Sequence, residues 1–294
     1  MDSIERTYRE ICEADKVLIG ASNGLSISEG IHIFADNADF REYFSYYRNQ
    51  LGIPNIINGC FFPYRTAEER WGFYSSMYHY FTVVRPVSQV MQNLMSLIRK
   101  KDYFVVTSNI DAHFIHAGFD RDRLFEIEGN CCDMQCGKGC HETVYPAEEL
   151  LIKMFAQKEN GKVSKDLVPN CPQCGGPMVL HIETDRNFVK DHRWNDSASA
   201  YRDFCQVPSD KKIVLLELGV GMRNRLIKQP FMDFTYKHPN ATYVTFNKGD
   251  IYIPSEIAGQ SVAMDGNIAK FLNVLAGKNN DRNKEDGNNA KTNS

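Results

Sequence analysis

Four of the nine cysteines form two closely spaced pairs, and this pattern constrains the fold more than any other feature of the chain. Three residues separate Cys136 from Cys140, and two separate Cys171 from Cys174, with two glycines directly after the second pair. Such pairs let two tight turns offer four thiolates to one tetrahedral Zn²⁺. Because four protein ligands leave no position for water, we expect a structural zinc that folds a small module.

The other cysteines show no comparable pattern. Cys131 and Cys132 are close enough in sequence to be alternative ligands, but buried or free thiols are the favoured interpretation. His141 directly follows Cys140 and could replace it, although four cysteines already satisfy the ion. The remaining thiols are expected in the core: Cys12, Cys60 and Cys205.

The overall composition excludes several classes of protein. With 294 residues, 43% of them hydrophobic and 24% charged, the chain resembles an ordinary globular protein. The net charge is −3 and no Lys/Arg cluster occurs, so nucleic acid is not an expected partner. The first twenty residues are too charged for a signal peptide, and no run of 18 apolar residues occurs, so we expect a cytoplasmic protein without a membrane partner.

Five short apolar runs predict the strands of a parallel sheet. They are residues 16–20, 103–107, 124–127, 212–218 and 241–247. Ile4, Tyr8 and Ile11 predict an amphipathic helix before the first run, and residues 268–275 predict a last helix. The expected fold class is therefore α/β, with a Rossmann-type parallel sheet, an inserted zinc-binding module and a helical insertion.

Changes in composition suggest where the domains begin and end. We assign residues 1–130 and 206–277 to a discontinuous nucleotide-binding domain, and residues 131–205 to the zinc module. An aromatic-rich stretch at about 40–85 predicts a helical insertion that packs over the cofactor. The polar, low-complexity tail 278–294 is expected to be disordered.

Polar or glycine-rich segments follow the predicted strands, where open α/β sheets bind ligands. After the first strand comes the small-residue loop Gly20–Gly30, which leads towards a helix; after the others come Thr107–Asp111, Gly219–Gly221 and Asn247. Backbone amides and short side chains at these points can hold phosphates and riboses. The candidate cofactor-binding residues are Gly20, Ala21, Ser22, Gly24, Leu25, Ser26, Phe34, Ser108, Asn109, Asp111, Gly219, Val220, Gly221, Asn247 and Lys248.

In this order, the motifs resemble those of the sirtuin family across roughly residues 4–276. Gly24-Leu25-Ser26 with Gly30-Ile31 is similar to the family's GxS…GI cofactor loop, and residues 107–111, TSNID, are similar to its TQNID motif. The paired cysteines, the glycine turn at 219–221 and Asn247 follow in the expected places. The resemblance implies a Rossmann-type domain with inserted modules, and cleavage of NAD between nicotinamide and ribose.

Several departures point away from the deacylating sirtuins. Glu128-Gly129 stands where those enzymes carry the catalytic His-Gly pair, and residues 32–35, HIFA, keep only Phe34 of a PDFR-like motif. Residues 180–185 also depart from the loop that holds the acyl-lysine peptide. The wider first cysteine pair, the cofactor loop, the turn at 218–221 and residues 186–189 instead resemble the macrodomain-linked sirtuins (SirTM).

The resemblance to that class implies protein ADP-ribosyl transfer onto a lipoylated carrier of the glycine-cleavage H type, reversed by a partner macrodomain hydrolase. Its catalytic pair is an Asn and a Gln; Asn109 matches the Asn, whereas Glu128 stands at the Gln position. We take Asn109 and Glu128 as the candidate catalytic residues. Glu128 either stabilises positive charge or accepts a proton, or else it repels phosphates or binds a hydroxyl group.

Other interpretations of these residues stay open. Asn109 and Asp111 orient ribose and nicotinamide in one interpretation and cap the next helix in the other. His113 and His116 are expected on a helix face rather than in catalysis. For the whole protein, the alternatives to ADP-ribosyl transfer are an NAD-dependent deacylase and a non-catalytic sensor of NAD or ADP-ribose.

Overall fold

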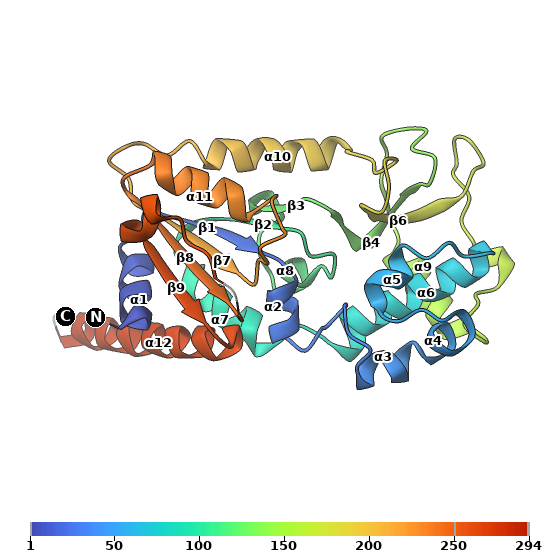
Figure 1. Ribbon diagram of the computed structural model, residues 1–294, viewed down its shortest axis with the longest axis horizontal. Coiled ribbons are helices and arrows are strands. Elements are labelled where there is room, and N and C mark those ends of the chain that lie inside the picture. The colour runs from blue at the N-terminus through green and yellow to red at the C-terminus, as the bar shows by residue number, and fades with distance from the viewer. Residues whose placement is uncertain (1, 250, 293–294) are drawn as a thin grey trace.

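The chain folds around two sheets. The computed structural model describes residues 2–249 and 251–292, with side chains up to residue 282. The larger sheet is parallel and has the strand order β3-β2-β1-β7-β8-β9; the smaller is antiparallel, with the order β5-β4-β6 (Figure 1). The predicted α/β class with a parallel sheet is confirmed. The strands are β1 (Lys16–Ala21), β2 (Asp102–Thr107), β3 (Leu124–Glu126), β4 (Gly129–Cys136), β5 (Tyr145–Pro146), β6 (Met178–Ile182), β7 (Ile213–Leu218), β8 (Ala241–Asn247) and β9 (Ser261–Asp265).

Helices cover both faces of the larger sheet (Figure 1). One face packs against α1 (Ser3–Glu13), α7 (Gln89–Ile98) and the first part of α12 (Ile268–Thr292). The other face packs against α10 (His192–Phe204) and α11 (Lys228–Lys237). The central strands are apolar at consecutive positions because successive side chains point to opposite faces, and both faces are covered. Val17 and Ile19 accordingly pack on the first face, and Leu18 packs on the second.

The order of the strands creates a crevice at one edge of this sheet. From β1 the chain adds β2 and β3 on one side, and from β7 it adds β8 and β9 on the other, so the direction of winding reverses between β1 and β7. Open α/β sheets bind ligands at such a point, outside the carboxyl ends of the strands. Residues predicted to bind the cofactor follow β1, β2, β7 and β8 at this edge.

A second group of helices packs against the smaller sheet. It consists of α3 (Ala38–Tyr43), α4 (Ser45–Leu51), α5 (Ile56–Cys60), α6 (Ala67–His79), the π-helix η1 (Tyr80–Val84) and α9 (Glu148–Gln157). Their aromatic side chains share one apolar cluster with residues of β4 and β6. The predicted helical insertion is therefore present, but its aromatics fill this core rather than covering the cofactor site. Large aromatic rings bury more apolar area in such a core than they would at the wall of a solvent-exposed cleft.

Two further elements differ from the expectations. Residues 23–28, expected as part of a loop, form the short helix α2 (Asn23–Ser28) directly after β1. The helix α10, which we assigned to the zinc module, packs on the larger sheet, where Phe204 and Tyr201 contact Phe104. The remaining short elements are α8 (His113–His116) and the 3₁₀ turns η2 (Arg121–Arg123), η3 (Lys165–Leu167) and η4 (Ser255–Gln260).

The helix α12 continues past Lys278 to Thr292, over residues for which the sequence predicted disorder. The Tyr8 hydroxyl donates to the Lys278 carbonyl at 3.3 Å, the Lys278 ammonium lies 2.6 Å from Glu5, and Asn279 donates to the Ser96 carbonyl at 2.8 Å. Once a helix is anchored, each added residue extends it at little cost, so polar composition alone did not predict its end. Residues 293 and 294 lie outside the described part. No helix among the described residues has the length and apolarity needed to cross a membrane.

The cluster around Phe73 generates a stability prediction. This ring is fully buried, and its centroid lies 5.4 Å from that of Phe44, 5.2 Å from that of Tyr47 and 6.0 Å from that of Tyr64. Phe73→Ala should lower the free energy of unfolding by about 3–5 kcal/mol, because a large cavity opens among rigid rings. Denaturant unfolding measures this loss. Phe61→Ala, at a ring that is 57% exposed, is the control and should change little; equal losses would contradict the packing described.

Candidate functional site

A cavity of about 710 Å³ lies at the switch point between β1 and β7. Residues from the ends of several strands line it, as the sequence predicted for a ligand site in such a sheet. The predicted site residues among its walls are Ser22, Gly24, Phe34, Ser108, Glu128, Gly219, Gly221, Asn247 and Lys248. Segments far apart in the sequence are therefore brought together in one place.

The floor of the cavity depends on a close contact between two glycines. The Gly24 amide donates to the Gly219 carbonyl at 3.0 Å. A Cβ atom on Gly24 would lie 2.5 Å from the Gly219 Cα, and Gly219 has a φ of +66°, which side-chain-bearing residues rarely adopt. Only glycine at both positions allows the start of α2 to approach the turn after β7.

Short polar side chains form a network beside this contact. The Ser108 hydroxyl donates to the Ser22 hydroxyl at 3.0 Å, and the Asn224 amide donates to Ser108 at 3.0 Å and to Ser22 at 3.3 Å. This network joins the loops after β1, β2 and β7. It therefore fixes the polar wall of the cavity before any ligand is present.

Asn109 has the most informative hydrogen bonding in this region. Its backbone amide donates to Thr107 Oγ1 at 3.0 Å, and its side-chain amide donates to the Ser22 carbonyl at 3.3 Å. Its Oδ1 atom is buried yet has no hydrogen-bond partner. An unsatisfied buried acceptor is costly, and such exceptions call for a specific explanation. A ligand hydroxyl or amide that donates to Oδ1 provides one.

Asp111 has a structural role in this conformation. One carboxylate oxygen accepts from the His113 amide at 3.0 Å at the start of α8, and the other accepts from the Ser26 hydroxyl at 2.5 Å. Asp111 therefore bonds the first amide of α8 without being its N-cap residue, which is Ala112, and Asn109 caps no helix. Asp111 also joins α8 to α2, which holds both sides of the cofactor loop.

Glu128 lies in the linker between β3 and β4 and lines the cavity. Burial, together with the nearby charge of Glu183, raises the pKa of Glu128 to about 7. The two residues are adjacent because the Glu183 amide donates to the Glu128 carbonyl at 2.9 Å. The next residue must be glycine, since a Cβ at Gly129 would lie 2.0 Å from the His181 carbonyl oxygen. The side chain of Glu128 is therefore neutral in a large fraction of molecules near pH 7.

The nearby histidines do not reach the cavity. Burial of His113 disfavours its charge, but its hydrogen bond with Glu29 and the charge of Asp111 outweigh that effect and raise its pKa to about 9. Its two ring nitrogens contact Glu29 at 3.1 Å and the Phe81 carbonyl at 2.9 Å, so the ring braces the loop. No histidine lines the cavity in the described part of the chain. The imidazole that a deacylating sirtuin requires is thus missing from its walls.

The remaining predicted cofactor residues lie behind the walls. Asn109, Ser26 and Asp111 are buried and do not line the cavity, although Asn109 bonds directly to the Ser22 carbonyl of its wall. The other four pack against the apolar core: Gly20, Ala21, Leu25 and Val220. Only their backbone atoms are therefore placed to contact a ligand.

Sequence reasoning missed six residues that line the cavity: Asn23, Ile27, Arg223, Asn224, Arg225 and Leu226. Four of them belong to the loop that continues past Gly221 to α11. Arg223 and Arg225 offered a signal, because two cations directly after a glycine turn suit the phosphates of a dinucleotide. A second cavity, of about 480 Å³, lies between α10 and the β3–β4 region, and none of the predicted site residues line it.

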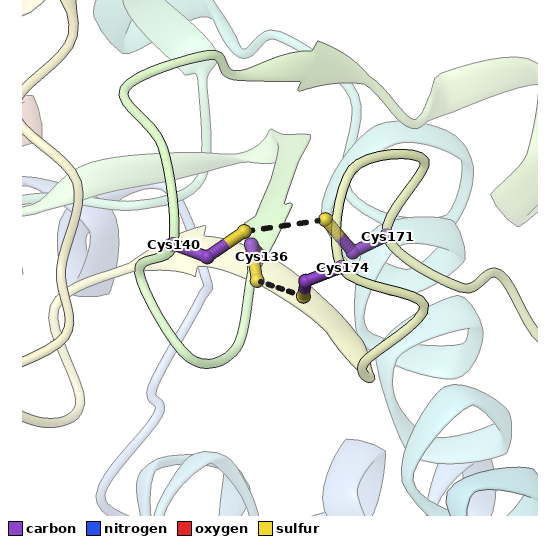
Figure 2. Close-up of side chains that lie close together, drawn as sticks. All are labelled: Cys136, Cys140, Cys171 and Cys174. Carbon is purple, nitrogen blue, oxygen red and sulfur yellow. Dashed lines mark hydrogen bonds between the residues drawn. The ribbon is translucent and has the colours of Figure 1, made fainter.

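The four cysteines of the two pairs converge at the end of the smaller sheet (Figure 2). The Cys136 and Cys174 sulfurs are 3.7 Å apart, and those of Cys140 and Cys171 are 3.6 Å apart. Tetrahedral Zn²⁺ with Zn–S bonds of about 2.3 Å requires S···S separations of about 3.8 Å. The donor set and its spacing therefore fit the predicted structural zinc.

The alternative ligands considered from the sequence lie elsewhere or add nothing to this set. His141 Nδ1 is 3.0 Å from the Cys140 sulfur and 3.8 Å from that of Cys171, but its other nitrogen contacts the Tyr145 hydroxyl at 3.0 Å. It is thus placed to steady the thiolates rather than to replace one. Cys131 and Cys132 are buried in β4 and do not join the four-cysteine cluster.

Solved structures of sirtuins share this fold. A sirtuin structure that addresses substrate affinity matches with a TM-score of 0.62 and 16% identity, over 94% of this chain and 98% of that one. A Sir2 homologue in complex with NAD matches with a TM-score of 0.58 and 13% identity, over 96% and 95% of the two chains. The fold is therefore that of the Sir2 sirtuins, the class that the motifs indicated.

The curated relatives are more specific. The chain is 28% identical, over 264 residues, to a protein ADP-ribosyltransferase of Staphylococcus aureus (strain Mu50 / ATCC 700699), covering 89% of this chain and 83% of the relative. It is 27% identical to a probable bifunctional ADP-ribose hydrolase/ADP-ribosyltransferase of Fusarium oxysporum f. sp. cubense, of which it spans 46%. No family model matches. The predicted resemblance to sirtuin-type ADP-ribosyltransferases is confirmed.

The cysteine cluster predicts one tightly held zinc ion per chain. Cys174→Ala should release this ion and destabilise the smaller sheet, because three thiolates would be left without their shared cation. Elemental analysis together with thermal unfolding measures both effects. Cys205→Ala, in a cysteine outside the cluster, is the matched control and should keep the ion. Full zinc content in Cys174→Ala would contradict the assignment.

Proposed function

We propose that the chain is an NAD-dependent protein mono-ADP-ribosyltransferase of the sirtuin type, which releases nicotinamide. The observation that carries this proposal is the unsatisfied Oδ1 of Asn109 beside a cavity that contains Glu128 and no histidine. The orphaned acceptor fits a nucleotide hydroxyl, and the missing imidazole disfavours deacylation. The names of the two curated relatives support transfer of ADP-ribose.

The residues of this chain supply positioning and electrostatic stabilisation. Breaking the bond between nicotinamide and ribose places positive charge on the ribose, and preorganised polar groups lower the energy of that state. The Oδ1 atom of Asn109 accepts a hydrogen bond from a ribose hydroxyl, because the side-chain NH₂ group already donates to the Ser22 carbonyl. Arg223 and Arg225 attract the pyrophosphate at the mouth of the cavity. The acceptor side chain then bonds to the ribose carbon as its bond to nicotinamide breaks; nicotinamide leaves as a neutral molecule, and the acceptor's proton passes to solvent.

Glu128 acts in this proposal as a neutral hydrogen-bonding group. A protonated carboxyl presents a carbonyl oxygen and an O–H donor, much as the Gln expected at this position presents an oxygen and an N–H donor. The pKa of about 7 keeps this form populated in neutral solution. The Gln-to-Glu difference is thus compatible with the same role.

The proposed acceptor is a lipoylated carrier of the glycine-cleavage H type, and the proposed partner for reversal is a macrodomain hydrolase. Both rest on the resemblance to macrodomain-linked sirtuins. The Fusarium relative, whose name combines an ADP-ribose hydrolase with a transferase, supports a functional link to a hydrolase. None of the described cysteines forms a disulfide, which suits the cytoplasm, the compartment we propose.

The mass of the carrier after incubation with NAD tests the proposal. An added ADP-ribose on the lipoylated carrier is expected, and Asn109→Ala should slow its appearance about a hundredfold, the usual loss for one preorganised polar group. Asn279→Ala, remote from the cavity, is the control. Release of nicotinamide without a labelled carrier would instead indicate a hydrolase, and binding of NAD without release would indicate a sensor. Deacetylation of a peptide would indicate a deacylase.

The pH dependence of transfer tests the role of Glu128. Wild-type activity should fall as the pH rises through about 7, because the carboxyl loses its proton and its donor. Glu128→Gln cannot ionise and should stay active from pH 6 to 9, whereas Glu128→Ala should lose about tenfold at pH 6, the worth of one hydrogen bond. Activity that rises through pH 7 and is lost in Glu128→Gln would instead make the carboxylate a base.

A further inference from the structure

Three side chains with metal-binding chemistry meet away from both the cavity and the four cysteines. They are His116 at the end of α8, Cys132 in β4 and Glu148 at the start of α9. Their ligand atoms all lie within 4.8 Å of one another, and His116 Nε2 is 3.7 Å from Glu148 Oε1. A thiolate, an imidazole and a carboxylate are the three ligand types that Zn²⁺ takes in proteins.

We propose that His116, Cys132 and Glu148 bind a second Zn²⁺ ion. Tetrahedral bonds of about 2.0–2.3 Å to nitrogen, oxygen and sulfur require ligand separations of about 3.3–3.7 Å. The 3.7 Å between His116 and Glu148 meets this requirement, and the Cys132 sulfur lies within 4.8 Å of both. Three protein ligands leave a fourth position for water or an external donor. The site also has an entry path, since the side chains of His116 and Glu148 are 30% and 43% exposed, whereas Cys132 is buried.

The surrounding bonds hold two of the ligands in place before the ion arrives. The Ala147 amide donates to the Cys132 carbonyl at 2.8 Å, which fixes the start of α9 against β4. The Cys132 amide donates to Asn130 Oδ1 at 2.9 Å. The Tyr78 hydroxyl donates to Glu148 Oε1 at 3.1 Å and so orients the carboxylate. Such second-layer bonds are typical of metal sites and tune their affinity.

The ion joins two parts of the fold that already share one backbone hydrogen bond here, from the Cys131 amide to the Ile110 carbonyl at 2.9 Å. His116 belongs to α8, whose first amide bonds Asp111, and this helix directly follows the Asn109 segment beside the switch-point cavity. Cys132 and Glu148 belong to the smaller sheet and its helix. The second zinc therefore fastens the loop that carries Asn109 to the four-cysteine module.

Cobalt titration of the purified full-length protein tests the site. With the four-cysteine site filled by zinc, Co²⁺ should bind in one further equivalent and show a thiolate-to-cobalt absorption band in the near ultraviolet. Cys132→Ser should lose this equivalent and the band, and Tyr78→Phe should weaken its binding about 10- to 100-fold, as loss of a second-layer bond does. Glu148→Gln, at a partly exposed position, should also weaken cobalt binding, and this variant tests the site where Cys132→Ser does not fold.

Cys205→Ser is the matched control, because it removes a thiol outside both clusters and should keep the second equivalent. Circular dichroism of each variant establishes that the fold is intact. Binding of only the four-cysteine equivalent by the wild-type protein, or an unchanged second equivalent in Cys132→Ser, would overturn the proposal. Neither outcome depends on transfer activity, so this test is independent of the proposed function.

Discussion

The site depends on the contact between Gly24 and Gly219, which lets the start of α2 approach the turn after β7. Two backbones meet there with no side chain between them, at the point where the sheet reverses its winding. The contact sets the distance between the loops after β1 and β7. The Ser22, Ser108 and Asn224 network can form only because these loops are held together.

Two polar groups in and beside the cavity are uncompensated. Asn109 keeps a buried acceptor without a partner, and Glu128 is held beside Glu183 in a poorly hydrated position. Each is unfavourable in the free protein. Both are expected where a ligand completes the hydrogen bonding, so they identify the place at which binding energy is available for catalysis.

Much of this arrangement could be predicted from the sequence. Apolar runs such as 16–20 and 241–247 predicted five strands, because strands buried on both faces need consecutive apolar residues. The cysteine spacing predicted the cluster of four thiols. β9 was missed because it is short and polar at both ends, with only three apolar residues between Ser261 and Asp265. The helical tail was missed because its anchors, such as Tyr8 with Lys278, are tertiary contacts.

The site residues that the sequence did not predict also depend on tertiary contacts. The motif residues indicated the cavity, but Arg223, Arg225 and Asn224 follow the motif and reach the site only through the path of their loop. The pKa of Glu128 depends on burial and on Glu183, which the chain brings near through β6. The meeting of His116, Cys132 and Glu148 requires three elements to converge, and local spacing does not report this.

A crystal structure of the protein with ADP-ribose tests the central claim most directly, namely that the switch-point cavity is the nucleotide site. The account predicts the pyrophosphate beside Gly24 and Arg223, and a ribose hydroxyl within hydrogen-bonding distance of Asn109 Oδ1. ADP-ribose in the cavity between α10 and the β3–β4 region, or an Asn109 Oδ1 still without a partner in the complex, would contradict it.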